Sequence, residues 1–325
     1  MHYMIQEIRE ETSLLDKYLS KSMKESSSAL KHVMDSNVSI TSGNGTSYNA
    51  AYYLSLLFLK RNIFAIPVYA SEFSKVLVDK FNFKNTSIIF FSQSGETLDA
   101  ITAAKLGKIN GAFSVSISNV PESSLTTMAD VSIITPAGPE KSIAATKSHM
   151  GQLLSSLSIF FADRPDDFKH LLGNLREGFN SIMSQEVEIR NLAENITNKV
   201  VFLGSGLEYP VAREGALKLK ETSSTITDAY PVREFLHGPK QILDDTWTVF
   251  MLSKEDAVMT DLSKLTHSLV DVDEIIHEQF NAKFTSDLES SIIKVLFIQL
   301  LAYYRSVFLG LDPDRPTKLT KVIKS

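Results

Sequence analysis

Short apolar, β-prone segments alternate with helical segments along the first half of the chain. The β-prone segments lie at 38–43, 64–69, 87–91, 113–119 and 131–136, and helical patterns lie near 47–60, 71–80, 97–108 and 142–162. One or two amphipathic helices are expected before them, within residues 4–36. This β-α-β rhythm predicts a parallel sheet that is covered by helices on both faces.

The same alternation starts again near residue 199, after a polar stretch and a helical pattern at 163–198. β-prone segments lie at 199–206, 224–231, 246–253 and 267–272, with helices expected near 208–222 and 286–310. The most apolar stretch, 295–311, carries Gln299 and Arg305 and is short for a membrane span, so it predicts a buried helix. We expect four parts: an N-terminal helical segment (1–24), a first domain (25–165), a second domain (186–310) and a C-terminal tail (311–325).

A short signature occurs twice, half a chain apart. Residues 43–51 read GNGTSYNAA and residues 204–212 read GSGLEYPVA, so both fit G-x-G-x-x-Y-x-x-A. Each copy follows a β-prone run and precedes a predicted helix, which indicates a duplicated strand, glycine turn and helix start. Turns of this kind bind anions, because the amides at the helix start point toward the ligand.

Composition excludes several classes of protein. The chain has 325 residues, a net charge of −5 and no basic tract, which disfavours nucleic acid as a partner. It has no cysteine, so disulfides, thiolate metal sites and a cysteine nucleophile are excluded. The acidic start lacks the pattern of a signal peptide, and the histidines lack the spacing of metal ligands. We therefore expect a cytoplasmic protein with no membrane segment and no metal site.

Two loops offer hydroxyl groups for a phosphate. Thr46 and Ser47 follow the first glycine turn, at a helix start, although they could also serve only as helix caps. The second loop, SQSGET at 92–97, carries Ser92, Gln93, Ser94 and Thr97 after an apolar strand. Ligands bind at this end of parallel strands, and a capping box with Ser94 as the cap is the alternative.

A third candidate is the predicted helix that follows the second glycine turn. Within REGALKLKE (213–221), Glu214, Lys218 and Glu221 share one face, while Arg213 and Lys220 point elsewhere. A solvated salt-bridge face is the common meaning of such a pattern. Beside a cleft, however, a carboxylate next to a lysine could act as a general base between two carbons.

Two further groups could move protons or form a covalent bond. His237 lies in the loop-like segment EFLHGPKQ, and histidine carries protons near neutral pH. The tail has Lys318 and Lys321, and a lysine with a lowered pKa can form a Schiff base with a ketone. The alternatives are that His237 is structural or has no role and that the tail is only a solvated basic segment.

Taken in order, SGNGTSYNA, SQSGET, ATK (145–147), REGALKLKE, EFLHGP and DPDRPTKLTK resemble one known family. It is the isomerase portion of glutamine–fructose-6-phosphate amidotransferases, the glucosamine-6-phosphate synthases. The likeness covers nearly the whole chain after residue 25. It implies an α/β fold of two similar sugar isomerase (SIS) domains, each a flavodoxin-like three-layer αβα unit with a parallel sheet, followed by a catalytic tail.

The resemblance also implies roles at the matched positions. Glu221 would move the proton between C1 and C2 beside Lys218, His237 would assist ring opening from a neighbouring subunit, and Lys321 would be the Schiff-base lysine. A homodimer with a shared site is therefore expected, with no cofactor. The positions implied to bind the sugar and its phosphate are Gly45, Thr46, Ser47, Ser92, Gln93, Ser94, Thr97, Ile143 and Ala145.

The sequence departs from the family pattern at several points. The glutaminase domain is not part of it, Asn44 stands where the synthases commonly have a cysteine, and Ala145 replaces a usual serine. The expected reaction is interconversion of glucosamine 6-phosphate and water with fructose 6-phosphate and ammonia. A fructosamine-6-phosphate deglycase and a non-catalytic phosphosugar sensor are the alternatives.

Overall fold

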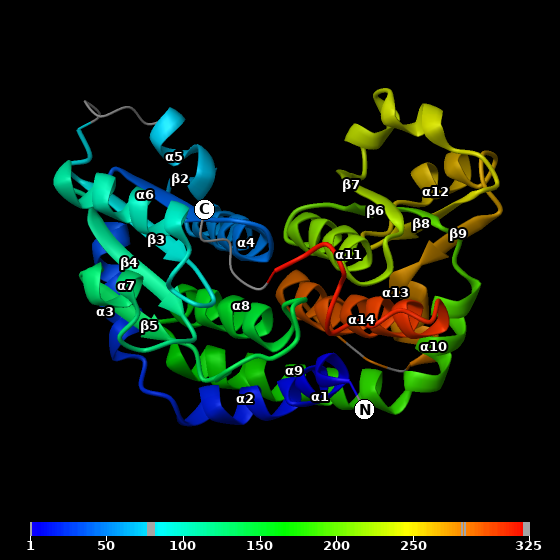
Figure 1. Ribbon diagram of the computed structural model, residues 1–325, viewed down its shortest axis with the longest axis horizontal. Coiled ribbons are helices and arrows are strands. Elements are labelled where there is room, and N and C mark those ends of the chain that lie inside the picture. The colour runs from blue at the N-terminus through cyan, green and yellow to red at the C-terminus, as the bar shows by residue number, and fades with distance from the viewer. Residues whose placement is uncertain (1, 77–81, 281, 283, 321–325) are drawn as a thin grey trace. The chain divides into compact units, whose positions relative to one another are not determined.

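The computed structural model describes the whole chain except residues 1, 77–81, 281, 283 and 321–325. Two compact units are present, and each is built around its own parallel sheet (Figure 1). The five-stranded unit comprises the described residues of Ser13–Glu140, Lys147–Leu172 and Thr320–Ser325. The four-stranded unit comprises those of Met1–Thr12, Lys141–Thr146 and Gly173–Leu319.

The sheet of the five-stranded unit has the strand order β2-β1-β3-β4-β5, and all its pairs are parallel. This is the flavodoxin-like order. Its central strand β3 is buried along its whole length, whereas Pro67 lies on the edge strand β2, where a missing N–H is tolerated. The strands are β1 (Val38–Gly43), β2 (Ala65–Tyr69), β3 (Thr86–Phe91), β4 (Phe113–Ser118) and β5 (Val131–Ile134).

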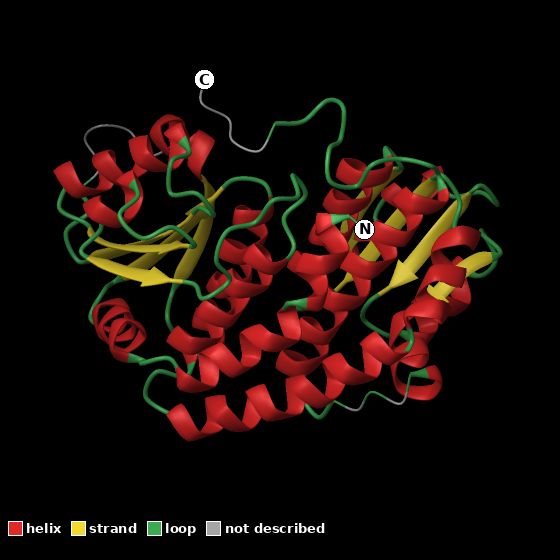
Figure 2. Cartoon of the chain, turned by 60° about the horizontal axis from the view of Figure 1, so that its bottom comes forward, coloured by secondary structure: helices red, strands yellow, loops and turns green. Residues whose placement is uncertain are grey.

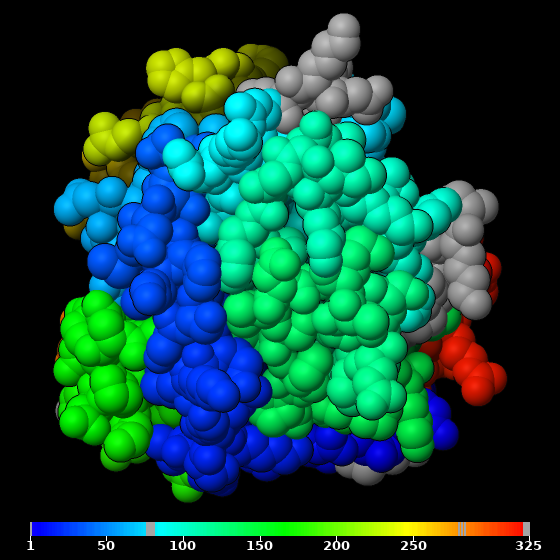
Figure 3. All heavy atoms as spheres, turned by 90° about the vertical axis from the view of Figure 1, so that its left-hand side faces the viewer, coloured from blue at the N-terminus to red at the C-terminus, as the bar shows by residue number. Residues whose placement is uncertain are grey.

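Helices pack around this sheet in two groups. In one group α4 contacts α8, and in the other α6 contacts both α5 and α7. Figure 2 shows helices on both sides of the strands. Alanines of α6 form one buried core with Phe83, with Phe73 of α5 and with Phe90 of β3. Helix α3 lies at the surface shown in blue in Figure 3. The helices are α2 (Glu11–Ser20), α3 (Lys24–Met34), α4 (Thr46–Lys60), α5 (Ala70–Val76), α6 (Leu98–Ile109), α7 (Ser124–Met128), α8 (Lys147–Phe160) and the first part of α9 (Pro165–Ser184).

The four-stranded unit repeats the same topology with one strand fewer. Its order is β7-β6-β8-β9, again all parallel, with α11 packed on β6 and β7. The elements are α1 (Tyr3–Arg9), α10 (Glu186–Asn195), β6 (Lys199–Gly204), α11 (Glu208–Ser223), β7 (Ile226–Pro231), β8 (Trp247–Met251), α12 (Asp256–Leu262), β9 (Ser268–Asp271), α13 (Val272–Glu274) and α14 (Asp287–Phe308). One-turn 3₁₀-helices cover Glu234–Leu236 and Pro239–Ile242. The two flavodoxin-like sheets confirm the predicted fold class.

The apolar helix α14 is a core element of the four-stranded unit. By length and composition it is the one described helix that could cross a membrane, but 83% of its most apolar window is buried inside the protein. It packs against α10, α11 and α1. The burial of α14 is therefore that of a core helix, as its sequence predicts.

Two local expectations were wrong. The N-terminal region forms three helices instead of one or two. The helix expected near 71–80 is present as Ala70–Val76, and the rest of that range lies outside the described residues. The helix expected over 142–162 begins at Lys147 and ends at Phe160. The preceding segment is not helical because its amides bond elsewhere: Glu7 accepts from the N–H groups of Lys141 and Ser142.

Candidate active site

Both glycine turns have the same two steric requirements. A Cβ on Gly43 would lie 2.7 Å from the backbone of Ser47, and one on Gly204 would lie 2.4 Å from the carbonyl oxygen of Glu208. Two residues on, the second glycine of each turn has a positive φ, 54° at Gly45 and 55° at Gly206. The repeated signature thus encodes a repeated backbone, and it places Ser47 and Glu208 at equivalent positions.

The first glycine turn does not use a side chain to cap helix α4. Helix α4 begins at Thr46, and its N-cap is Gly45, which has no side chain to cap with. Ser47 is half-buried, and its Oγ accepts a hydrogen bond from Nε2 of Gln152 over 2.9 Å. The first loop therefore does not use Ser47 as the N-cap residue, which was the alternative left open by the sequence.

The second loop, 92–97, follows β3 and is tightly folded. The Ser92 hydroxyl accepts from the Gly95 N–H at 3.1 Å and lies 3.3 Å from the Thr97 hydroxyl, and the Ser94 hydroxyl accepts from the Glu96 N–H. Helix α6 begins at Leu98 with Thr97 as its N-cap, and no side chain caps it. The capping box with Ser94 as the cap is therefore wrong.

These two loops belong together in the five-stranded unit. They follow β1 and β3, which are neighbouring parallel strands with Ser42 in register with Phe90. Asn44 connects them: its Nδ2 donates to Asp99 of α6 over 2.9 Å, and its Oδ1 accepts from the N–H of Ser71. Both loops thus lie at the carboxyl-terminal ends of neighbouring strands, where helices α4 and α6 begin. This arrangement suits the binding of an anion.

The equivalent position in the second repeat is occupied by a carboxylate. Glu208 accepts hydrogen bonds from Ser253 and Ser290 and pairs with the fully buried Lys294. Lys294 also contacts Asp273, at 2.6 Å. This carboxylate takes the place that an anionic ligand would need, so the second glycine turn does not offer a phosphate site of the first kind.

Helix α11 carries a compact charged triad. The side chains of Lys218 and Glu214 are fully buried, with Nζ 3.5 Å from the Glu214 carboxylate, and the same Nζ bonds to Glu221. Glu221 retains 22% of its side-chain exposure. The predicted shared face is confirmed, and Glu221 is the member that solvent or a small molecule can reach.

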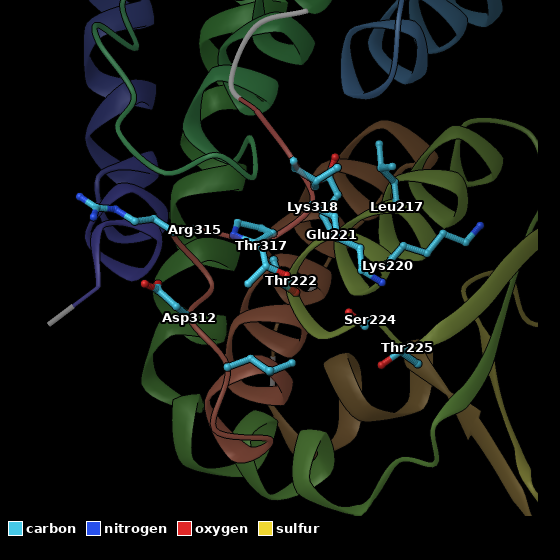
Figure 4. Close-up of a pocket in the computed structure, with 13 residues that line it drawn as sticks. Leu217, Lys220, Glu221, Thr222, Ser224, Thr225, Asp312, Arg315, Thr317 and Lys318 are labelled. Carbon is cyan, nitrogen blue, oxygen red and sulfur yellow. The ribbon is translucent and has the colours of Figure 1, made fainter.

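A cavity of about 480 Å³ opens beside Glu221 (Figure 4). Its walls come from the second half of α11 and from the segment after α14, where Arg315 extends away from α11. Lys220 also lines it, although the helical pattern placed that residue on another face. The lining residues are Leu217, Lys220, Glu221, Thr222, Ser224, Thr225, Leu311, Asp312, Arg315, Pro316, Thr317, Lys318 and Leu319.

The remaining predicted residues are placed as follows. The Ile143 N–H donates to the carbonyl oxygen of Asp314, so the segment that also holds Ala145 lies against the C-terminal segment. His237 is exposed at the end of a 3₁₀-helix and is not among the residues lining the cavity beside Glu221. Lys321, the expected Schiff-base lysine, lies outside the described residues.

Sequence reasoning missed three contributors. Asn44 was read only as a departure from the family pattern, and neither Gln152 nor Lys294 was considered. An asparagine inside a glycine turn is a signal that could have been used, because its amide can both donate and accept. Within the described part of the chain, no group of three or more His, Cys, Asp or Glu residues is arranged to hold a metal ion.

Comparisons with known proteins agree with this architecture. A glutamine–fructose-6-phosphate aminotransferase (isomerizing) from Sulfolobus acidocaldarius is 33% identical over 99% of this chain, which spans only 56% of that protein. The solved C-terminal domain of glucosamine-fructose-6-phosphate aminotransferase from Francisella tularensis has a TM-score of 0.83 and 26% identity, covering 97% of this chain and 98% of that one.

A second solved structure shows the same fold. Glucosamine-6-phosphate deaminase from Thermotoga maritima has a TM-score of 0.82 at 24% identity, with 99% of both chains covered. The SIS domain family matches residues 34–162 and 196–264, more than half of the sequence and both glycine turns. The resemblance drawn from the motifs is confirmed, and the chain belongs to the SIS domain family.

Proposed function

We propose that this protein interconverts glucosamine 6-phosphate and water with fructose 6-phosphate and ammonia. The observation that carries the proposal is the Glu221 carboxylate, which is bonded to buried Lys218 and still opens into a cavity of about 480 Å³. A carboxylate held in this way has a fixed position for proton transfer between adjacent carbons. The names of the relatives, a glutamine–fructose-6-phosphate aminotransferase and a glucosamine-6-phosphate deaminase, support the substrate class.

Two groups of residues would divide the work. The phosphate would be bound by hydroxyl-bearing residues of loops 42–48 and 92–97, among them Thr46, Ser47, Ser92, Ser94 and Thr97. Gln93 and the backbone of Gly45, Ile143 and Ala145 would contact the rest of the sugar. Binding energy from the phosphate would position C1 and C2 for the proton transfer.

The chemical step moves one proton and exchanges one nitrogen for one oxygen. In the open-chain aldehyde, Glu221 takes the proton from C2, and the resulting enolamine receives a proton at C1. This converts the amine at C2 into an imine, water adds to C2, and ammonia leaves as the C2 ketone forms. His237 from a neighbouring subunit would open the sugar ring, and Lys321 would form the Schiff base with the ketose.

The test is turnover of glucosamine 6-phosphate by the purified protein, with ammonia and fructose 6-phosphate measured together. Glu221→Gln should lower kcat by about 10²- to 10⁴-fold, the usual contribution of a general base. Glu194→Gln, which removes a surface carboxylate paired with Arg190, is the matched control. Equal turnover in the Glu221→Gln variant and the control would refute the assigned role.

The size of the cavity favours one second candidate, a fructosamine-6-phosphate deglycase. Ammonia needs far less than 480 Å³, whereas an amine with a side chain could fill the space between α11 and residues 311–319. A panel of N-substituted fructosamine 6-phosphates separates the two: release of glucose 6-phosphate and an amine identifies the deglycase. Binding of phosphosugars without any turnover would instead identify a sensor.

A further inference from the structure

A buried glutamine contacts the first glycine turn from the interior of the five-stranded unit. Gln152 lies on α8, its residue is 1% exposed, and its Nε2 donates to the Ser47 Oγ over 2.9 Å. We propose that Gln152 is a positioning residue that directs the hydroxyl hydrogen of Ser47 toward the substrate phosphate. This inference rests on the proposed function, because it assumes that Ser47 binds a phosphate.

The argument begins with the hydrogen-bonding capacity of a hydroxyl group. A serine hydroxyl has one hydrogen to donate and two lone pairs that accept. A phosphate dianion only accepts, so Ser47 can stabilise it only by donating its hydrogen. Because the Gln152 amide occupies a lone pair of Ser47, the hydrogen of Ser47 cannot point at Gln152 and stays available to a ligand.

Burial shows that Gln152 acts through Ser47 and does not touch the ligand itself. The side chain is enclosed between α8 and the helix it packs against, α4, which begins with Thr46 and Ser47. A substrate bound at the loop can reach Ser47, which is half-buried, but not the enclosed amide.

The other end of the amide indicates that its polarity matters. Oε1 of Gln152 is buried and has no hydrogen-bond partner in the described structure. An unpaired buried carbonyl oxygen costs stability, and a leucine of similar volume would fill the same space without that cost. The contact that distinguishes glutamine from leucine here is the donation from Nε2 to Ser47.

The test compares an apolar and an acidic substitution of Gln152. Inorganic phosphate and glucosamine 6-phosphate are the probes in calorimetric titrations. Gln152→Leu removes the donor, so Ser47 can rotate, and Kd for both probes should rise about 3- to 10-fold. Gln152→Glu supplies only acceptors, takes the Ser47 hydrogen and adds a negative charge, so Kd should rise at least tenfold further. The ratio of the Gln152→Glu Kd to the wild-type Kd should be smaller at pH 6 than at pH 8, because a protonated carboxyl group can donate a hydrogen bond to Ser47.

Ser155→Ala is the matched control, since Ser155 is a buried polar residue of the same helix and contacts Tyr18 instead of Ser47. It should leave Kd for both probes unchanged. In a Ser47→Ala background, Gln152→Leu should have no further effect on Kd, whereas a merely structural role would lower binding in both backgrounds. If Gln152→Leu does not fold, Gln152→Met replaces it.

Two results would overturn the inference, and they are distinguishable. If the wild type binds neither probe, the proposed phosphate site fails and the positioning role fails with it. If the wild type binds and the folded leucine and glutamate variants have equal Kd values, the phosphate site stands, but Gln152 does not direct the hydroxyl hydrogen of Ser47.

Discussion

Asn44 links the two hydroxyl-rich loops of the five-stranded unit, because its Nδ2 donates to the Asp99 carboxylate over 2.9 Å. Asn44 belongs to the turn after β1, and Asp99 to the first turn of α6, which follows the loop after β3. The link therefore fixes the spacing between the two loops of the candidate phosphate site.

Asn44→Ala should loosen this site. Without the amide, the two loops are no longer tied, and we expect KM and Kd for sugar phosphates to rise about 3- to 10-fold, with a loss of about 1 kcal/mol in stability. Asn110→Ala is the control. It removes one hydrogen bond of a side-chain amide, from Asn110 to the Leu106 carbonyl, at the C-terminal end of α6. Equal effects of the two variants on Kd would contradict the assigned role of Asn44.

A site shared between subunits predicts complementation. Homodimers of Glu221→Gln and of His237→Ala should each be nearly inactive, because each lacks one proton-transfer group in both sites. After mixing and reassortment, half of the dimers would be mixed, and each would contain one intact site, which restores about a quarter of wild-type turnover.

The activity of the mixture decides where His237 acts. Restoration requires that Glu221 and His237 of one site come from different chains. If the mixture stays as inactive as the parents while mixed dimers are present by native mass spectrometry, His237 acts within its own subunit or not at all.

The motifs predicted the fold well because fold class depends on local patterns. The alternation of segments gave the parallel sheets, and the G-x-G turns gave the helix starts, since those constraints lie within a few residues. The contacts that organise the site join distant residues: Asn44 and Asp99 are 55 residues apart, and Gln152 and Ser47 are 105 apart. No periodicity in the sequence reports on such pairs.

The filled second turn illustrates the same limit. Glu208 stands in the repeated signature itself, but the buried lysine that pairs with it, Lys294, lies 86 residues later in an apolar helix. Only the folded structure shows that the two side chains face each other.

The Lys294–Glu208 pair yields a stability prediction. Lys294→Met removes the buried cation that pairs with Glu208 and should destabilise the protein by about 3–5 kcal/mol, since it leaves the buried Glu208 carboxylate uncompensated. Adding Glu208→Gln should recover a large part of that loss. Urea unfolding of the two single variants and the double variant gives the coupling energy, and additive effects would show that the pair does not interact.

An ion pair elsewhere in the five-stranded unit gives a prediction on pH. The Arg61 guanidinium hydrogen-bonds to Asp163 through two nitrogens, at 2.5 and 2.8 Å, and this lowers the pKa of Asp163 from 3.8 to about 2. A carboxylate with a depressed folded-state pKa contributes stability above its unfolded pKa and loses it as pH falls toward the folded value. The contribution should therefore be complete above about pH 5 and disappear between pH 4 and pH 2.

The measurement is the difference in the free energy of unfolding between wild type and Asp163→Asn across this range of pH. The difference should stay below about 1 kcal/mol, because the Asp163 side chain is 47% exposed. Asp166→Asn, at a carboxylate that is 93% exposed, is the control. A difference that grows as the solution becomes more acidic would have the wrong sign for this ion pair.

The central claim is that one group of residues binds the phosphate and another performs the proton transfer, and paired titration and kinetics of Ser94→Ala and Glu221→Gln test it most directly. We predict that Ser94→Ala raises Kd and KM for glucosamine 6-phosphate about 3- to 10-fold with kcat nearly unchanged. Glu221→Gln should keep Kd near the wild-type value and lower kcat about 10²- to 10⁴-fold. Unchanged affinity in Ser94→Ala, or unchanged kcat in Glu221→Gln, would contradict the account.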